Sequence, residues 1–165
     1  MFKKGEMVSY STTGLCEITD VTSISEKGIK TQYYVLQPFY QKTSKIYVPV
    51  NNETLVAKMR SVITKKEVDD IILKAKDDPM EWIENDIKRN EVFKEIYGTG
   101  DLSLIIKMIG CIYIHGKELA QSKRRLRAAD SIYFQNAEQL VNNELAYVLD
   151  INPNEVTEYI KLKMK

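Results

Sequence analysis

A chain of 165 residues, 44% of them hydrophobic, can bury a core as one domain or as two small ones. It has no apolar run of the roughly 18 residues that a membrane span needs, and its start lacks the apolar stretch of a secretion signal, so we expect a cytoplasmic protein with no membrane partner. The net charge of +1 hides a segregated pattern, because residues 102–130 carry six basic side chains against two acids, whereas residues 61–101 carry seven against eleven.

The first 55 or so residues have the patterns of β-strands. Short runs rich in β-branched and aromatic residues alternate with turn signals such as Glu26-Lys27-Gly28 and Asn51-Asn52. The predicted strands cover residues 7–10, 15–21, 33–36 and 45–50. Four or five strands in so short a stretch cannot form two packed sheets. We therefore expect a small, strongly bent barrel of the SH3 or Tudor type over residues 1–60.

After residue 60 the apolar period becomes helical. Thr64 and Glu67 form a capping box, and Gly100-Asp101 ends one helix and caps the next. Two further helix starts combine a cap with proline at the first helical position, at Asp78-Pro79 and Asn152-Pro153. About five helices follow, so residues 61–165 are predicted to form an all-α bundle with its own core. The expected fold class of the chain is α+β.

Few groups in the sequence suit catalysis. His115 is the only histidine, which excludes the commoner zinc triads, and it falls at the predicted end of a helix over residues 101–115, where it favours the local dipole. Gly98-Thr99-Gly100 lacks the following Lys-Ser/Thr of a phosphate-binding loop. Cys16 and Cys111 lie far apart, and each is expected to be a small buried side chain. We therefore expect neither an enzyme nor a bound metal or cofactor.

A basic cluster lies between two apolar helices, with only Glu118 opposing it. Such a concentration of positive charge suits contacts with phosphates, although an ordinary solvated connection would have the same composition. The cluster consists of Lys117, Lys123, Arg124, Arg125 and Arg127.

Trp82 is the only tryptophan, and it is predicted to lie early in the helix that begins at Asp78. At about 100° per residue it falls at the border of the apolar arc of that helix, on the side of Arg89. Two interpretations follow from this rim position. The indole either closes the bundle against the barrel, or it acts as a wedge or stacking platform for a base at a duplex end or in a melted bubble.

Several motifs follow one another in a specific order. The N-terminal ones are residues 2–10, Thr13-Gly14, residues 33–36, residues 46–52, Arg60 and Val62-Ile63. The later ones are a tryptophan before Gly100-Asp101, a basic segment, Ala128-Ala129-Asp130 and a helix through Glu138, Leu140, Val141, Glu144, Leu145 and Ala146. In this order and spacing the motifs resemble the CarD/CdnL family of bacterial transcription regulators, over almost the whole chain.

The resemblance implies a function. Residues 1–60 would be a Tudor-like module that binds the β subunit of RNA polymerase. Residues 61–165 would contact promoter DNA at the upstream edge of the transcription bubble, largely without reading its sequence, and stabilise the open complex near the nucleoid. The implied polymerase-binding residues are Lys45, Ile46, Tyr47, Val48 and Pro49. The implied DNA-binding residues are Trp82 as the wedge, with Lys88, Arg89, Lys117, Lys123, Arg124 and Arg125.

The same type of module also opens a transcription-repair coupling factor, but no helicase motif follows it here. An alternative function is a protein-interaction module without direct DNA contact, in which the barrel captures a partner strand along an exposed edge. Such an edge can also pair with a second copy of the chain, which leaves a homodimer open.

Overall fold

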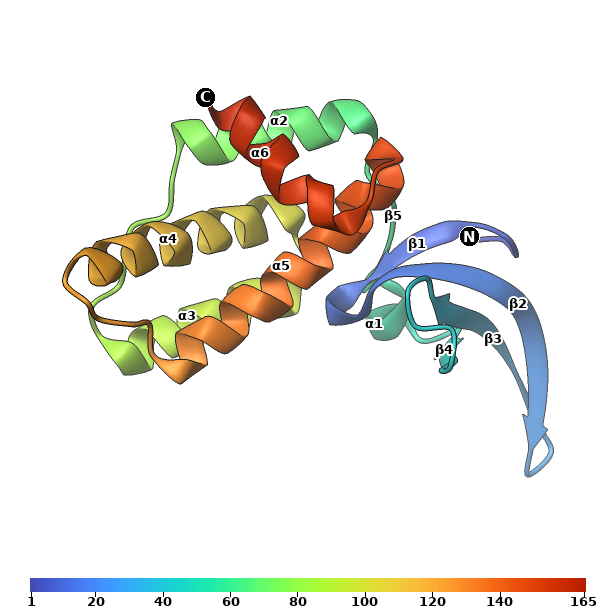
Figure 1. Cartoon of the computed structure of the whole chain (residues 1–165). Coiled ribbons are helices and arrows are strands. Elements are labelled where there is room, and N and C mark those ends of the chain that lie inside the picture. The colour runs from blue at the N-terminus through green and yellow to red at the C-terminus, as the bar shows by residue number, and fades with distance from the viewer. The chain divides into compact units, whose positions relative to one another are not determined.

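The computed structural model describes residues 1–165 and divides them into two compact units, residues 1–62 and 63–165. Figure 1 shows the helices and strands of each unit. Each unit has its own cluster of buried apolar side chains. No helix in either unit combines the length and the apolar character that crossing a membrane requires.

The first unit is a five-stranded antiparallel sheet in the order β4-β3-β2-β1-β5. Its strands are β1 (Met7–Tyr10), β2 (Gly14–Glu26), β3 (Ile29–Pro38), β4 (Ile46–Pro49) and β5 (Met59–Ser61). A 3₁₀ turn (Ser11–Thr13) joins β1 to β2, and the short helix α1 (Glu53–Val56) precedes β5. Strands β2 and β3 form a long, strongly curved hairpin (Figure 1).

Paired residues on one face of this sheet form its core. The register places Val8 opposite Cys16, Ile18 opposite Leu36, and Tyr34 opposite Val48, and all six side chains are buried. A bulge between Ile18 and Asp20 adds a bend to β2, which lets the strand curve over these side chains. The sequence therefore specifies the sheet through alternation of buried and exposed positions.

The four predicted strands are all present, but two elements were missed. Asn52 was taken as part of a turn, whereas its side chain accepts a hydrogen bond from the Leu55 amide and caps α1. The three residues of β5 pair with β1, about fifty positions away in the chain. A strand this short has no local pattern of its own, because it is stabilised by a distant partner.

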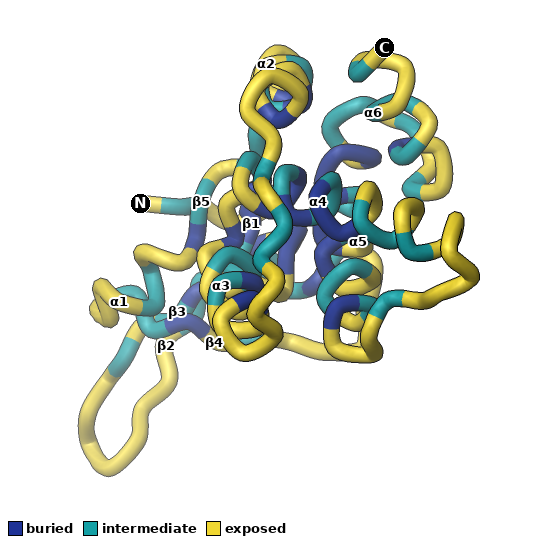
Figure 2. Tube along the Cα trace, turned by 90° about the vertical axis from the view of Figure 1, so that its left-hand side faces the viewer, coloured by how far each residue is buried: buried dark blue, intermediate teal, exposed yellow.

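The second unit consists of five helices, as predicted, which makes the whole chain α+β. They are α2 (Lys65–Asp77), α3 (Asp86–Thr99), α4 (Leu102–Gln121), α5 (Ala128–Leu149) and α6 (Val156–Met164), the last preceded by a 3₁₀ turn at Pro153–Glu155. Most of the buried residues of this unit lie on α4 and α5 (Figure 2). Its largest fully buried side chains include Phe93, Ile72, Ile105, Met108, Ile112 and Leu145.

Four of the predicted helix termini are confirmed by their hydrogen bonds or backbone conformation. Thr64 and Glu67 form the reciprocal capping box of α2. Gly100 adopts the left-handed conformation that ends α3, and Asp101 accepts hydrogen bonds from the first amides of α4. Asn152 caps the turn that leads into α6. The remaining predicted start, at Asp78, is wrong, and its correction bears on the candidate site.

Hydrogen bonds connect α6 to α2. The carboxylate of Asp69 accepts hydrogen bonds from the Tyr159 hydroxyl at 2.7 Å and from Nζ of Lys163 at 3.0 Å. These bonds stabilise the ionised form, so the pKa of Asp69 lies below its usual value. The contact therefore links the last helix of the unit to its first.

We expect Tyr159→Phe to lower the free energy of unfolding by about 1 kcal/mol at pH 7, because it removes one hydrogen bond to a carboxylate. Since the pKa of Asp69 is lowered in the folded state, the stabilisation is complete above the ordinary carboxyl pKa of about 4 and is lost as the pH falls through the folded value. Urea unfolding of wild type and variant at pH 7 and at about pH 2.5 measures the difference in free energy of unfolding. If wild type and variant differed in free energy of unfolding by the same amount at both pH values, the hydrogen bond from Tyr159 to ionised Asp69 would not be the cause.

Candidate functional site

Trp82 does not lie on a helix. It belongs to the segment of residues 78–85, which connects α2 to α3 without regular structure. The helix expected to start at Asp78 begins instead at Asp86, because the side chain of Asn85 caps it by accepting a hydrogen bond from the Lys88 amide at 2.9 Å. Asp78 itself ends α2. The prediction that Trp82 lies on a helix was therefore wrong. The structure does place the half-buried Trp82 next to Arg89, as expected.

The indole of Trp82 is held between two planar side chains. The His115 ring stacks on it with a centroid separation of 3.7 Å and an angle of 13° between the planes. The Arg89 guanidinium carbon lies 4.3 Å from the indole centroid. Two planar groups so close to one centroid cannot share a face of the ring, so both faces are covered. Phe93 approaches edge-on at 6.2 Å, and only part of the half-buried indole is open to solvent.

Arg89 is a buried structural cation, with 3% of its surface exposed. It donates two hydrogen bonds to the Asp130 carboxylate, at 3.0 and 2.9 Å, and one to Asp86 at 2.7 Å. Its Nη1 donates to the carbonyls of Ile83 at 2.8 Å and Glu84 at 3.4 Å. A helix would use these two carbonyls for its own hydrogen bonds, which explains why the chain just before α3 is not helical. Arg89 was expected to contact DNA, but its burial and its hydrogen bonds leave it no free donor group.

The sequence did not predict that His115 stacks on Trp82 or that Asp130 pairs with Arg89. The histidine was placed at the end of a helix, but α4 continues to Gln121, so His115 lies within it and faces Trp82. Asp130 is 4% exposed, and the sequence signalled it only as part of the motif Ala128-Ala129-Asp130, without a partner. Its partner is 41 residues away, a distance that no local pattern spans.

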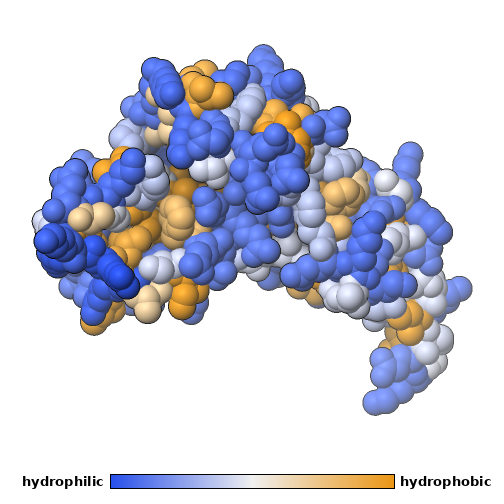
Figure 3. All heavy atoms as spheres, in the orientation of Figure 1, coloured by the Kyte–Doolittle hydropathy of each residue, from blue (hydrophilic) through white to orange (hydrophobic).

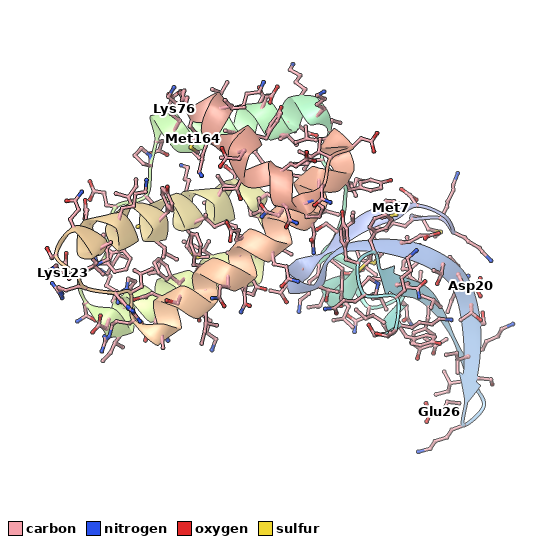
Figure 4. All side chains as sticks on the ribbon, in the orientation of Figure 1. Met7, Asp20, Glu26, Lys76, Lys123 and Met164 are labelled. Carbon is pink, nitrogen blue, oxygen red and sulfur yellow. The ribbon has the colours of Figure 1, made fainter.

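The basic cluster lies at the α4–α5 connection, where Lys123 is labelled in Figure 4 and where strongly hydrophilic side chains gather (Figure 3). Lys117, Lys123, Arg124 and Arg125 are exposed, and none of them takes part in the salt bridges of the chain. Arg127 differs, because it is paired with Asp86. We call the four exposed residues the basic loop.

The basic loop and the indole occupy the same end of the helical unit. Asp86 connects them, because one oxygen accepts from Arg89, which covers Trp82, while the other pairs with Arg127 at the end of the loop. Lys88 is exposed in the first turn of α3, two residues beyond Asp86. The helical unit thus combines cations without salt bridges and a partly exposed aromatic ring, and this combination suits a polyanion with accessible grooves.

In the first unit, residues 45–49 form an edge. Strand β4 ends the sheet order and pairs only with β3. Tyr47 is 49% exposed and touches Tyr33 edge-on at 6.3 Å, and Lys45 is exposed just before the strand. Ile46 and Pro49 are half-buried, and the side chain of Val48 is fully buried, so that Val48 can offer a partner only its backbone.

The two cysteines are buried and unpaired. Burial raises the pKa of the Cys16 thiol to about 12, and burial also raises that of Cys111, with the charge of Arg89 acting in the opposite direction. Neither thiol is therefore ionised near neutral pH, which removes the reactive form of both side chains. No three His, Cys, Asp or Glu side chains are grouped so as to hold a metal ion.

Comparison with known families gives one match. Residues 2–63 match the family described as the CarD-like/TRCF RID domain. A search of curated proteins found nothing similar to the chain. The matched range coincides with the sheet unit, and the helical unit lies outside it.

Proposed function

Because residues 2–63 are a CarD-like/TRCF RID domain, we propose that the chain is a CarD-type transcription regulator without catalytic activity. In this proposal the sheet unit binds the β subunit of RNA polymerase, and the helical unit contacts promoter DNA at the upstream edge of the bubble and stabilises the open complex. The family match carries the proposal, since it spans the entire sheet unit. Such a regulator would act in the cytoplasm, at the nucleoid.

The edge strand β4 supports the polymerase contact. An edge offers unpaired backbone groups that a strand of the partner can extend, and exposed side chains beside it supply specificity. Tyr47 presents half of its surface next to this edge, and Lys45 adds a charge at its start. An exposed tyrosine is a typical anchor of such an interface, because it buries a large area at little entropic cost.

We expect Tyr47→Ala to weaken binding to the polymerase β subunit by about tenfold, which corresponds to the loss of one moderate anchor residue. Titration of the full chain against labelled β subunit measures the effect. Ile29→Ala is a suitable control, since Ile29 is 70% exposed at the start of β3, at the tip of the hairpin. Equal affinity of wild type and Tyr47→Ala would mean that β4 is not the contact.

The DNA contact would use the basic loop together with Lys88 and the exposed part of Trp82. Arg89 and Arg127 have carboxylate partners and maintain the geometry of the site. Because both faces of the indole are covered, the ring would enter a groove with its edge, whereas stacking on a base would require His115 to move. Contacts of lysine and arginine with phosphates carry no sequence information, so promoter preference would follow from how easily the DNA melts.

Neither contact has to be strong alone. Attachment to polymerase holds the helical unit near the promoter at an effective concentration in the millimolar range. Weak, non-specific DNA contacts are then sufficient to favour the open state. The chain would act by prolonging an intermediate that polymerase itself forms, without catalysing any step.

Salt dependence tests the DNA contact and separates it from the alternative in which the chain binds proteins only. We expect the logarithm of affinity for a polymerase–promoter complex to fall steeply with the logarithm of salt concentration. Replacing Arg124 and Arg125 by alanine should reduce the slope by about 2, because each phosphate contact contributes about 0.9. A double Lys66→Ala/Lys94→Ala variant removes equal charge from exposed positions of α2 and α3 and should leave the slope nearly unchanged. Identical slopes for both double variants would favour the alternative.

A further inference from the structure

Two hollows adjoin on the helical unit. One, of about 170 Å³, is lined mainly by apolar side chains of α4, α5 and α6, among them Ile109, Val141, Ile160 and Met164. The other, of about 470 Å³, lies beside the basic loop. Both are lined by Tyr113 and Phe134, so the two hollows meet at these side chains, and we refer to them together as the groove. In Figure 3 hydrophobic atoms are visible between α4 and α5, and Figure 4 labels Lys123 and Met164 toward the opposite ends of this face.

A glycine in the middle of α4 leaves the wall of the apolar hollow open. Gly110 lines the apolar hollow, and a Cβ placed there would meet no atom within 4 Å. The fold therefore has no steric need for glycine at this position, although glycine within a helix costs about 1 kcal/mol relative to alanine. Gly116, by contrast, is explained within the fold, because a Cβ there would lie 3.2 Å from Leu126. The missing side chain leaves room on the surface of α4 for an external group, as Gly98 also does on α3.

The charges of the groove are asymmetric. At the basic loop its lining includes Lys117, Arg124 and Arg125, which form no salt bridges, and Ser131 in the first turn of α5. At the other end the cation Lys161 is paired with Glu158, and Glu138 hydrogen-bonds to Thr157. An anionic group is thus favoured at the basic end only, where guanidinium groups can bind phosphate oxygens in pairs.

We propose that this groove binds a small anionic amphiphile, with its apolar chain in the hollow between α4, α5 and α6 and a phosphate-like head at Lys117, Arg124 and Arg125. The lining residues of α4, from Ile106 to Ala120, extend over about 21 Å at 1.5 Å per residue, which gives the ligand an elongated site. The site lies outside the CarD-like domain and does not depend on the proposed function. If both hold, the ligand head and promoter phosphates use the same cations, and the ligand opposes DNA binding.

Calorimetric titration of the full chain with monomeric dodecyl phosphate tests the proposal. Inorganic phosphate presents the head alone, dodecyl glucoside presents the chain with a neutral head, and vesicles containing an anionic phospholipid present the head as a membrane surface. We expect dodecyl phosphate to bind at least about tenfold more tightly than each of the first two probes, because the site uses chain and charge together. Tighter binding of the vesicles would indicate a membrane surface and overturn the proposal.

Variants locate the site. Gly110→Leu should weaken dodecyl phosphate binding by about tenfold or more, and Arg124→Ala/Arg125→Ala should reduce the affinity to that of dodecyl glucoside. Gly110→Ala is the milder variant, and both Gly110 variants are expected to melt at or above the wild-type temperature, since the space is open. Lys66→Ala/Lys94→Ala is the charge-matched control. Unchanged binding in Gly110→Leu, or a wild-type dimer that Gly110→Leu converts to a monomer, would refute a small-molecule site.

Discussion

Replacing Arg89 by methionine is expected to lower the free energy of unfolding of the helical unit by about 3–5 kcal/mol, because it leaves Asp130 buried without its partner. The guanidinium also fixes residues 78–85 through the carbonyls of Ile83 and Glu84 and covers one face of Trp82. One substitution therefore removes the support of the connecting segment together with a buried ion pair. Arg89 thus links α3 both to α5 and to the segment that precedes α3.

Urea unfolding followed by tryptophan fluorescence measures this effect for the helical unit, since Trp82 is the only tryptophan. Arg127→Met is the matched control. It also removes an arginine that pairs with Asp86, but both side chains of that pair are well exposed, so the expected loss is below about 1 kcal/mol. Arg89→Met/Asp130→Leu should recover much of the lost stability, because no charge stays buried. Equal losses for Arg89→Met and Arg127→Met would show that burial does not determine the energetics here.

Trp82→Ala is expected to shorten the lifetime of promoter open complexes by about tenfold, as for the loss of one anchor residue of an interface. Binding to the polymerase β subunit should stay at the wild-type level, because that contact belongs to the sheet unit. Open-complex half-life with the cognate polymerase, measured after addition of a competitor, tests the prediction. An unchanged half-life with intact polymerase binding would rule out a role for the indole.

Loss of packing has to be separated from loss of the DNA contact, since Trp82 also touches the core of the helical unit. Trp82→Phe keeps an aromatic ring between His115 and Arg89 but shortens the edge that reaches solvent. We expect it to retain most of the stability, measured by urea unfolding followed by circular dichroism, and to give an intermediate half-life. If half-life instead follows stability across the three proteins, the indole acts through folding alone.

Much of the fold was predictable because it is specified locally. The capping box of Thr64, the left-handed Gly100 and the alternation in the strands depend on neighbouring residues, and each led to a correct prediction. The false helix start at Asp78 had the same local signature. It was overridden by the competing cap at Asn85 and by hydrogen bonds from Arg89 to carbonyls that a helix would have used.

The candidate site was predictable in composition but not in arrangement. The sequence identified Trp82 and the basic residues, yet it could not show that Arg89 is buried against Asp130 or that His115 stacks on the indole. Both facts depend on contacts between helices that are remote in the chain. A local pattern reports the charge of an arginine, whereas its burial decides whether that charge can reach a partner.

The covered indole has a kinetic consequence. His115 and Arg89 already hold the ring of Trp82 in one rotamer in the free protein. Ordering a large side chain at an interface costs about 0.5–1.5 kcal/mol, and here that loss of entropy accompanies folding of the helical unit and not association. In the proposed DNA contact, encounter would then require no ordering of the ring, and the avoided loss of entropy would lengthen mainly the lifetime of the complex.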